Sequence, residues 1–144
     1  PAEEPIMIFK SPEAVIRNAI ISDASVTQYV GHRVYADLAT AQIDLPFIIY
    51  RRSDISREQT LGVPMGVPRV SVEIGIFAET RLESRKIADA VRSTLDGYGG
   101  SFENTTVRQT SLESESDEIA ALDGSEVANA YSVTQTYDIW WQET

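Results

Sequence analysis

The sequence predicts an α+β protein with a mainly antiparallel sheet and two main helices packed on one face. Three observations predict this class. Residues 69–78 have an apolar side chain at every second position, two stretches begin with helix-capping residues, and a glycine- and proline-rich segment separates the second and third expected strands. A length of 144 residues suits one domain, residues 1–144, that buries a core without disulfides or metal.

The first helix is expected to begin after Ser11, whose hydroxyl can accept a bond from a free backbone N–H. Pro12 has the backbone angle of a first helical residue, and Glu13 suits the positive end of the helix dipole. Apolar residues then recur at helical spacing: Val15, Ile16, Ala19 and Ile20. Asp23 is expected to cap a short second turn that Gly31 ends.

Three strands are expected before the second main helix. Period-two alternation predicts strands over residues 33–39 and 69–78. The run that follows Pro46, residues 47–52, starts with apolar side chains on both faces, so it is expected to be central or covered by a helix.

The second main helix is predicted from a capping box, in which Thr80 and Glu83 can each satisfy a free backbone donor. Apolar residues continue at helical spacing to Leu95: Ile87, Ala88, Val91 and Leu95. Gly97 is expected to end this helix.

The last third is predicted to form two strands. Residues 105–116 indicate a polar strand, and residues 127–142 indicate a long strand rich in aromatic and β-branched side chains, with Gln135 as an interruption. Residues 113–126 read as a lengthened hairpin or an insertion.

Residues 56–68, called the arm below, contain two glycines and two prolines among apolar residues, and are predicted to form an extended loop with neither helix nor ladder. Loops of this length are uncommon in compact domains. The apolar side chains need a cover, and two covers are open: the arm folds over its own sheet, or it docks on a neighbouring subunit. Docking would make Leu61, Val63 and Met65 contact residues.

Charge is unevenly distributed along the chain. The formal net charge is −10, and residues 96–144 contain ten acidic side chains but one basic side chain. DNA binding through a basic face is therefore disfavoured there. Arginines flank the arm, among them Arg51, Arg52 and Arg69. They are either solvated loop charges or partners for the acidic last third of another copy, which a guanidinium pairs well.

The sequence contains no recognisable catalytic motif. It has no cysteine and a single histidine, His32, so thiolate chemistry, a metal centre built on histidines and a Ser-His-Asp triad are all disfavoured. The acidic residues Glu113, Glu115, Asp117 and Glu118 could form an acid–base pair or cation site, but a solvated acidic face is the more ordinary interpretation. We expect no enzyme, no cofactor and no metal. With no apolar run of about 18 residues, we also expect no membrane span. We further expect that the chain is made in a reducing cytoplasm and that its initiator methionine was removed before Pro1.

The layout resembles the small tail-completion, or tail terminator, proteins of long-tailed, siphovirus-like phages. The resemblance rests on the stretch Val30-Gly31-His32-Arg33-Val34-Tyr35, the strand Leu45 to Tyr50, the strand Val70 to Ala78 and the helix Ser84 to Leu95. It covers roughly residues 12–98 and gives no support for residues 113–126.

This resemblance implies a structural virion protein that assembles in the host cytoplasm and resides at the tail neck. Such proteins form a ring, commonly a hexamer, at the head-proximal end of the tail tube. The ring stops tube growth and meets the head–tail connector, so the implied partners are further copies of the chain, the tube protein and the connector protein. The acidic segment, Glu113, Glu115, Asp117 and Glu118, could line a channel that genome DNA passes without specific binding.

Three rival functions stay open. A head-completion or connector adaptor would cap a different end. A small ligand-binding regulatory domain would need a concave pocket with convergent polar groups. A hydrolase would need a carboxylate with a strongly raised pKa in a cleft.

Overall fold

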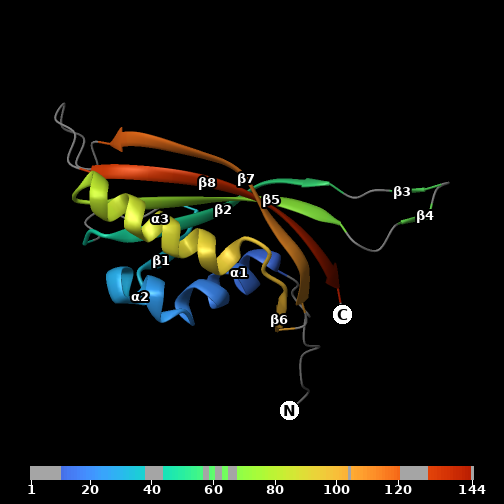
Figure 1. Cartoon of the computed structure of the whole chain (residues 1–144). Helices are drawn as coiled ribbons and strands as arrows, with labels where there is room; N and C mark the ends of the chain where they lie inside the picture. Colours follow the sequence, from blue (N-terminus) through green and yellow to red (C-terminus); the bar gives the residue numbers. More distant parts are fainter. Residues whose placement is uncertain are drawn as a thin grey trace, which may run out of the picture.

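The computed structural model describes residues 11–37, 44–56, 59–60, 63–64, 68–103, 105–120 and 130–143. Within these ranges the chain forms three helices, a six-stranded sheet and a two-stranded ladder (Figure 1). In chain order the elements are α1 (Pro12–Ile21), α2 (Ala24–Val30), β1 (Val34–Ala36), β2 (Phe47–Ser56), β3 (Gln59–Thr60), β4 (Val63–Pro64), β5 (Arg69–Ala78), α3 (Arg81–Leu95), β6 (Gly100–Phe102), β7 (Thr105–Ala120) and β8 (Ala130–Glu143).

The large sheet has the strand order β1-β2-β5-β8-β7-β6. Every neighbouring pair is antiparallel except β1 with β2, which is parallel. The three helices cover one face of this curled sheet (Figure 1). The predicted α+β class, with a mainly antiparallel sheet and helices on one face, is confirmed.

The helix starts follow the capping residues of the sequence. Ser11 Oγ accepts from the backbone N–H of Ala14 at 3.2 Å, and Thr80 Oγ1 accepts from that of Glu83 at 3.1 Å. Asp23 Oδ1 accepts from the backbone N–H of Ser25 at 2.8 Å and so caps α2, the short helix that stands where a short second turn was expected. Each bond satisfies one of the free donors of a first helical turn, so these predicted starts are confirmed.

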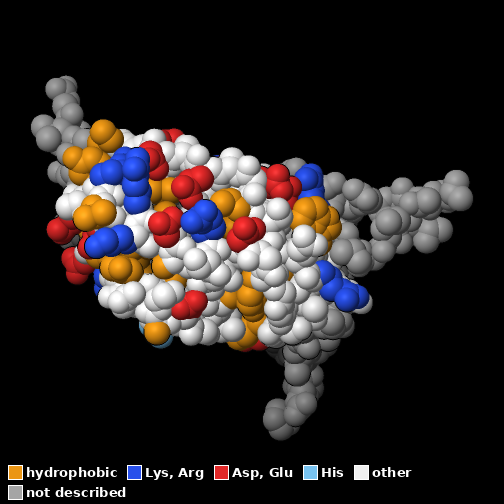
Figure 2. All heavy atoms as spheres, viewed as in Figure 1, with side chains coloured by type: hydrophobic (Ala, Val, Ile, Leu, Met, Phe, Trp, Pro, Cys, Tyr) orange, Lys and Arg blue, Asp and Glu red, His pale blue; other side chains and the backbone are white. Residues whose placement is uncertain are grey.

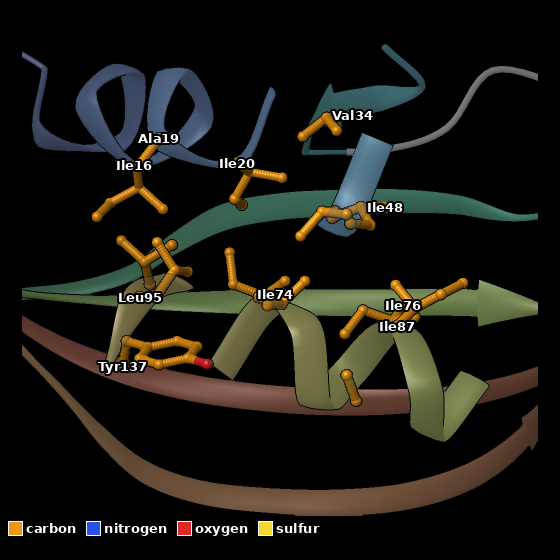
Figure 3. Packing of buried hydrophobic residues seen from close by; sticks show 14 of the residues in the cluster. Ile16, Ala19, Ile20, Val34, Ile48, Ile74, Ile76, Ile87, Leu95 and Tyr137 are labelled. Atoms are coloured by element: carbon orange, nitrogen blue, oxygen red, sulfur yellow. The ribbon is translucent and has the colours of Figure 1, made fainter. Parts of the chain in front are cut away.

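The core lies between the helices and the covered face of the sheet (Figure 3). In β5 every second residue is buried, as the alternation predicts. Its buried side chains are Val70, Val72, Ile74, Ile76 and Ala78. The apolar stripe of α3 lies over them, with Ile87 and Leu95 fully buried. Burying a side chain of this size contributes about 1.5–3 kcal/mol, so this layer is a large part of the driving force for folding.

Gln135 is the polar exception within the covered face of β8. Its side chain is fully buried, yet its Nε2 donates to the carbonyl of Ala88 at 2.9 Å and to Glu115 Oε2 at 2.8 Å. Tyr137 donates its hydroxyl to Gln135 Oε1 at 2.8 Å. The predicted interruption is therefore a satisfied polar group that ties α3 to β7 and β8, because buried amides are retained where they find partners.

The prediction that no ladder forms in residues 56–68 is wrong. β2 continues to Ser56, and β3 pairs with β4 in the register Gln59 to Pro64 and Thr60 to Val63. Both strands of a two-stranded ladder are edge strands, where a proline can point its missing donor outward. Strand ends differ as well: β1 spans only Val34–Ala36, whereas β7 continues to Ala120.

Asp23→Ala is expected to destabilise the protein by about 1 kcal/mol, because α2 loses its cap. Hydrogen bonds from Thr94, and then from Ser25, hold the pKa of Asp23 below its ordinary value. The contribution of Asp23 is therefore complete above the ordinary aspartate pKa of about 4 and is lost as pH falls through the lower folded-state pKa. Urea unfolding at neutral and at acidic pH checks this, with Asp23→Asn, which keeps a capping oxygen, as the control. An equal loss at both pH values would contradict it.

Candidate functional site

Arg69 lies at the end of the sheet from which the arm leaves, whereas Arg51 and Arg52 lie near the middle of β2, the strand that leads into the arm. Ser56 is opposite Arg69, and Arg51 is opposite Glu73 in the antiparallel pair of β2 and β5. Directly opposed residues share a face, and residues two apart on a strand share a face. Arg51 and Arg69 therefore lie together on the face away from the helices, whereas Arg52 lies on the helix-covered face.

Each of these arginines pairs with a carboxylate of its own chain. Arg51 Nε lies 2.7 Å from Glu73 Oε2, and Arg52 Nε lies 3.3 Å from a carboxylate oxygen of Glu13. Both arginine side chains are at least half exposed, so these pairs contribute little to stability. Their heads remain accessible to a second carboxylate from another molecule.

Arg69 forms the best-anchored of the three pairs. Its Nη1 lies 2.9 Å from Asp138 Oδ2, and Ser71 Oγ donates to Asp138 Oδ1 at 2.8 Å. Asp138 is buried, so both of its oxygens are satisfied away from water. This arrangement fixes the start of β5, at the base of the arm, to β8. The carboxylate that Arg69 binds therefore comes from the acidic last third of the same chain.

The predicted acidic face is divided between the two faces of the sheet. Glu115 lies opposite Gln135 and Asp117 opposite Val133, on the helix-covered side, whereas Glu118 lies opposite Ser132 on the other side. Glu113 falls at a register shift between Leu112 and Ser114.

Two of these carboxylates have partners within the chain. Asp117 accepts a bond from Arg85 at 2.7 Å and lies 3.8 Å from Arg81. Glu115 accepts from Gln135. Cations and amides of the protein itself therefore offset part of this acidic charge.

A surface hollow of about 310 Å³ lies between α3 and β7. It is lined by Arg85, Ala88, Asp89, Glu115 and Asp117. Its floor borders the Gln135 network, where burial raises the pKa of the Tyr137 phenol and keeps it neutral. Within the described ranges, no group of His, Cys, Asp or Glu side chains could hold a metal ion. We assign no ligand to the hollow, because each of its charged groups already has a partner within the chain: Arg85 pairs with Asp117, Asp89 with Arg92, and Glu115 accepts from Gln135.

The arm leaves the body between β2 and β5, and β3 and β4 lie beyond the ends of those strands (Figure 1). Val63 is in β4, opposite Thr60. The other predicted contact residues of the arm, Leu61 and Met65, fall outside the described residues.

Sequence reasoning missed a group of exposed side chains at the opposite end of the molecule. Among the described side chains, Leu82, Ile119 and Tyr131 are the large hydrophobic residues classed as exposed. One signal was available: Leu82 lies off the helical stripe that Ile87 and Leu95 define. The other two could not be grouped without the register that pairs Ile119 with Tyr131.

Together these features define a class: a small α+β domain whose strands β3 and β4 lie beyond the main sheet, with charges paired within the chain and a few exposed apolar side chains. The chain belongs to the family described as Tail completion protein gp17, whose model matches residues 14–141. It is therefore a structural, non-enzymatic component of a phage-like virion tail, as predicted from the resemblance.

A solved structure supports the same fold. One chain of the structure titled "Virion of native gene transfer agent (GTA) particle" superposes with a TM-score of 0.75. The two chains are 12% identical, and the match covers 91% of this chain and 94% of that one. At this identity the likeness shows the fold alone. Comparison with curated proteins gives no match.

None of the helices that the described residues form is long and apolar enough to cross a membrane.

Asp138→Ala is expected to cost about 2 kcal/mol of unfolding free energy, because Arg69 and Ser71 lose a buried acceptor. Glu73→Ala, which removes the partner of exposed Arg51, is the matched control and is expected to cost less than about 1 kcal/mol. Urea denaturation of both variants measures the difference. Equal losses would show that the Arg69 pair does not anchor the base of the arm.

Proposed function

We propose that this chain is a tail terminator: a subunit of a ring, hexameric by analogy with such proteins, at the head-proximal end of the tail tube. The ring stops tube polymerisation and presents a surface to the head–tail connector. Membership of the tail completion family supports this proposal.

The observation that carries the proposal is the arm. Residues 61–68 contain no charged side chain and four large apolar ones, Leu61, Val63, Met65 and Val67. β3 and β4 lie beyond the ends of β2 and β5 rather than over the sheet (Figure 1). An uncharged segment rich in large apolar side chains is suited to cover by another molecule. Ring formation requires such heterologous contacts between copies.

Charge supports the same arrangement. Arg51 and Arg52 have exposed heads on β2, the strand that leads into the arm, while the last third of the chain is strongly acidic. Neighbouring copies placed side by side would bring opposite charges together, which favours correct docking over random association. The subunit contact residues that we propose are Arg51, Arg52, Leu61, Val63, Met65 and Arg69.

The net charge of −10 also suits a ring through which DNA passes. Like charges reduce adsorption of a polyanion to the channel wall. We propose that Glu113, Glu115, Asp117 and Glu118 contribute to that acidic field or to a partner-facing surface.

Wild-type protein is expected to form a ring-sized oligomer, alone or with the tail-tube protein, in size-exclusion chromatography with light scattering. The triple variant Leu61→Ser, Val63→Ser, Met65→Ser is expected to remain folded but to lose the oligomer, since its arm has lost its apolar surface. Leu61→Met, Val63→Ile, Met65→Leu conserves that surface and is expected to assemble normally. A strictly monomeric wild type under both conditions would refute the ring.

Tail tubes assembled in vitro are expected to grow without a fixed limit when this chain is omitted, and to stop when it is added. Electron microscopy of tube lengths gives the measurement. If tubes stop at normal length without the chain, and heads instead fail to join, the adaptor function replaces the terminator.

A further inference from the structure

Exposed apolar side chains lie where α3 begins, β7 ends and β8 begins. Leu82 is 66% exposed, Ile119 62% and Tyr131 36%. Ile119 and Tyr131 are direct cross-strand neighbours. Figure 2 shows hydrophobic side chains beside basic ones at this end of the body. We call Leu82, Ile119 and Tyr131 the end cluster.

Arg81 connects the start of α3 to the adjacent ends of β7 and β8. Its guanidinium carbon lies 5.2 Å from the centre of the Tyr131 ring, a cation–π geometry. Its Nη1 donates to the carbonyl of Ser132 at 2.9 Å, and its Nη2 donates to that of Glu118 at 2.7 Å. Since Leu82 follows Arg81 on α3, this bonding fixes the start of the helix against the hairpin.

The composition of the end cluster is typical of a binding surface. Tyrosine and arginine are enriched among residues that dominate binding energy, and here Arg81 is already held in one orientation, so little entropy is lost on contact. Charged residues surround it, with the Arg85–Asp117 pair on one side. An apolar centre with a charged rim is the usual anatomy of a protein–protein contact.

The arm and the end cluster lie at opposite ends of β5. The arm leaves at Arg69, and Tyr131 is paired with Ala78 at the other end of that strand. Nine residues at about 3.3 Å each separate the two points by about 30 Å. The arm of one molecule therefore cannot cover its own end cluster, but it can reach the end cluster of a neighbour.

We propose that the end cluster is the surface on which the arm of a second copy docks. Two different complementary patches on one molecule generate a head-to-tail, heterologous contact, and such contacts form a ring when the rotation between neighbouring copies closes. The uncharged residues 61–68 match the apolar centre, and the arm is long enough outside the sheet to reach a neighbouring molecule. This inference rests on the proposed ring.

Disulfide trapping tests this pairing directly, because the chain contains no cysteine. Val63→Cys and Ile119→Cys are prepared as separate proteins, mixed with tail-tube protein present, oxidised and run on a non-reducing gel. We expect a covalent pair containing one molecule of each variant, and none from either variant alone. A chain that carries both substitutions is expected to give a ladder that ends at the ring size.

Each other outcome has a definite meaning. Linked pairs of Ile119→Cys alone would show that two end clusters meet, which overturns the inference. A ring by light scattering without mixed pairs also overturns the inference and leaves the proposed function intact. Absence of any oligomer overturns both.

Surface variants give an independent measure. Leu82→Ser with Ile119→Thr is expected to weaken subunit association at least tenfold with an unchanged unfolding midpoint, since both side chains are exposed. Lys86→Ser with Arg92→Ser changes two exposed positions of α3 outside the end cluster and is the matched control, expected to assemble normally. Equal assembly by both double variants in sedimentation velocity would place the arm's docking surface elsewhere.

Discussion

Burial of one face of β5 beneath three helices is the constraint on which the rest of the structure depends. Val70, Val72, Ile74 and Ile76 must face the core, and a slip of one residue would turn all of them to the other side. The same alternation sets the registers of β2 and β8, which both pair with β5. Those registers in turn determine where the arm leaves the sheet, where Arg69 meets Asp138, and where Ile119 lies beside Tyr131.

Local signals in the sequence predicted much of this fold. Ser11, Asp23 and Thr80 act within three residues of themselves, so their capping roles follow from the sequence alone. The alternation of β5 is equally local. The ladder of β3 with β4 was missed because glycine and proline disfavour regular strands. A two-stranded ladder needs only a few backbone hydrogen bonds, and these residues do not block them.

Long-range partners were beyond sequence reasoning. Arg69 and Asp138 are 69 residues apart, and nothing in their neighbours indicates that Ser71 completes the same group. The four acidic residues were grouped as one face because they are close in the sequence, but alternation itself puts Glu118 on the opposite face from Glu115 and Asp117, and β7 changes register at Glu113. A bulge of this kind moves side chains to new faces without a clear signature in composition. Arm contacts were predicted from an apolar surplus, which indicates that a partner is needed but not where it docks.

The continuity of the arm with β2 and β5 has a mechanical consequence. A pull on the arm along the strand direction cannot peel β5 away one bond at a time, because ten register pairs join β5 to β8 and all of them would resist sliding together. Antiparallel strands loaded lengthwise in this way yield at higher force than strands unzipped from one end. The contact proposed between the arm and a neighbouring subunit would therefore load β5 in shear.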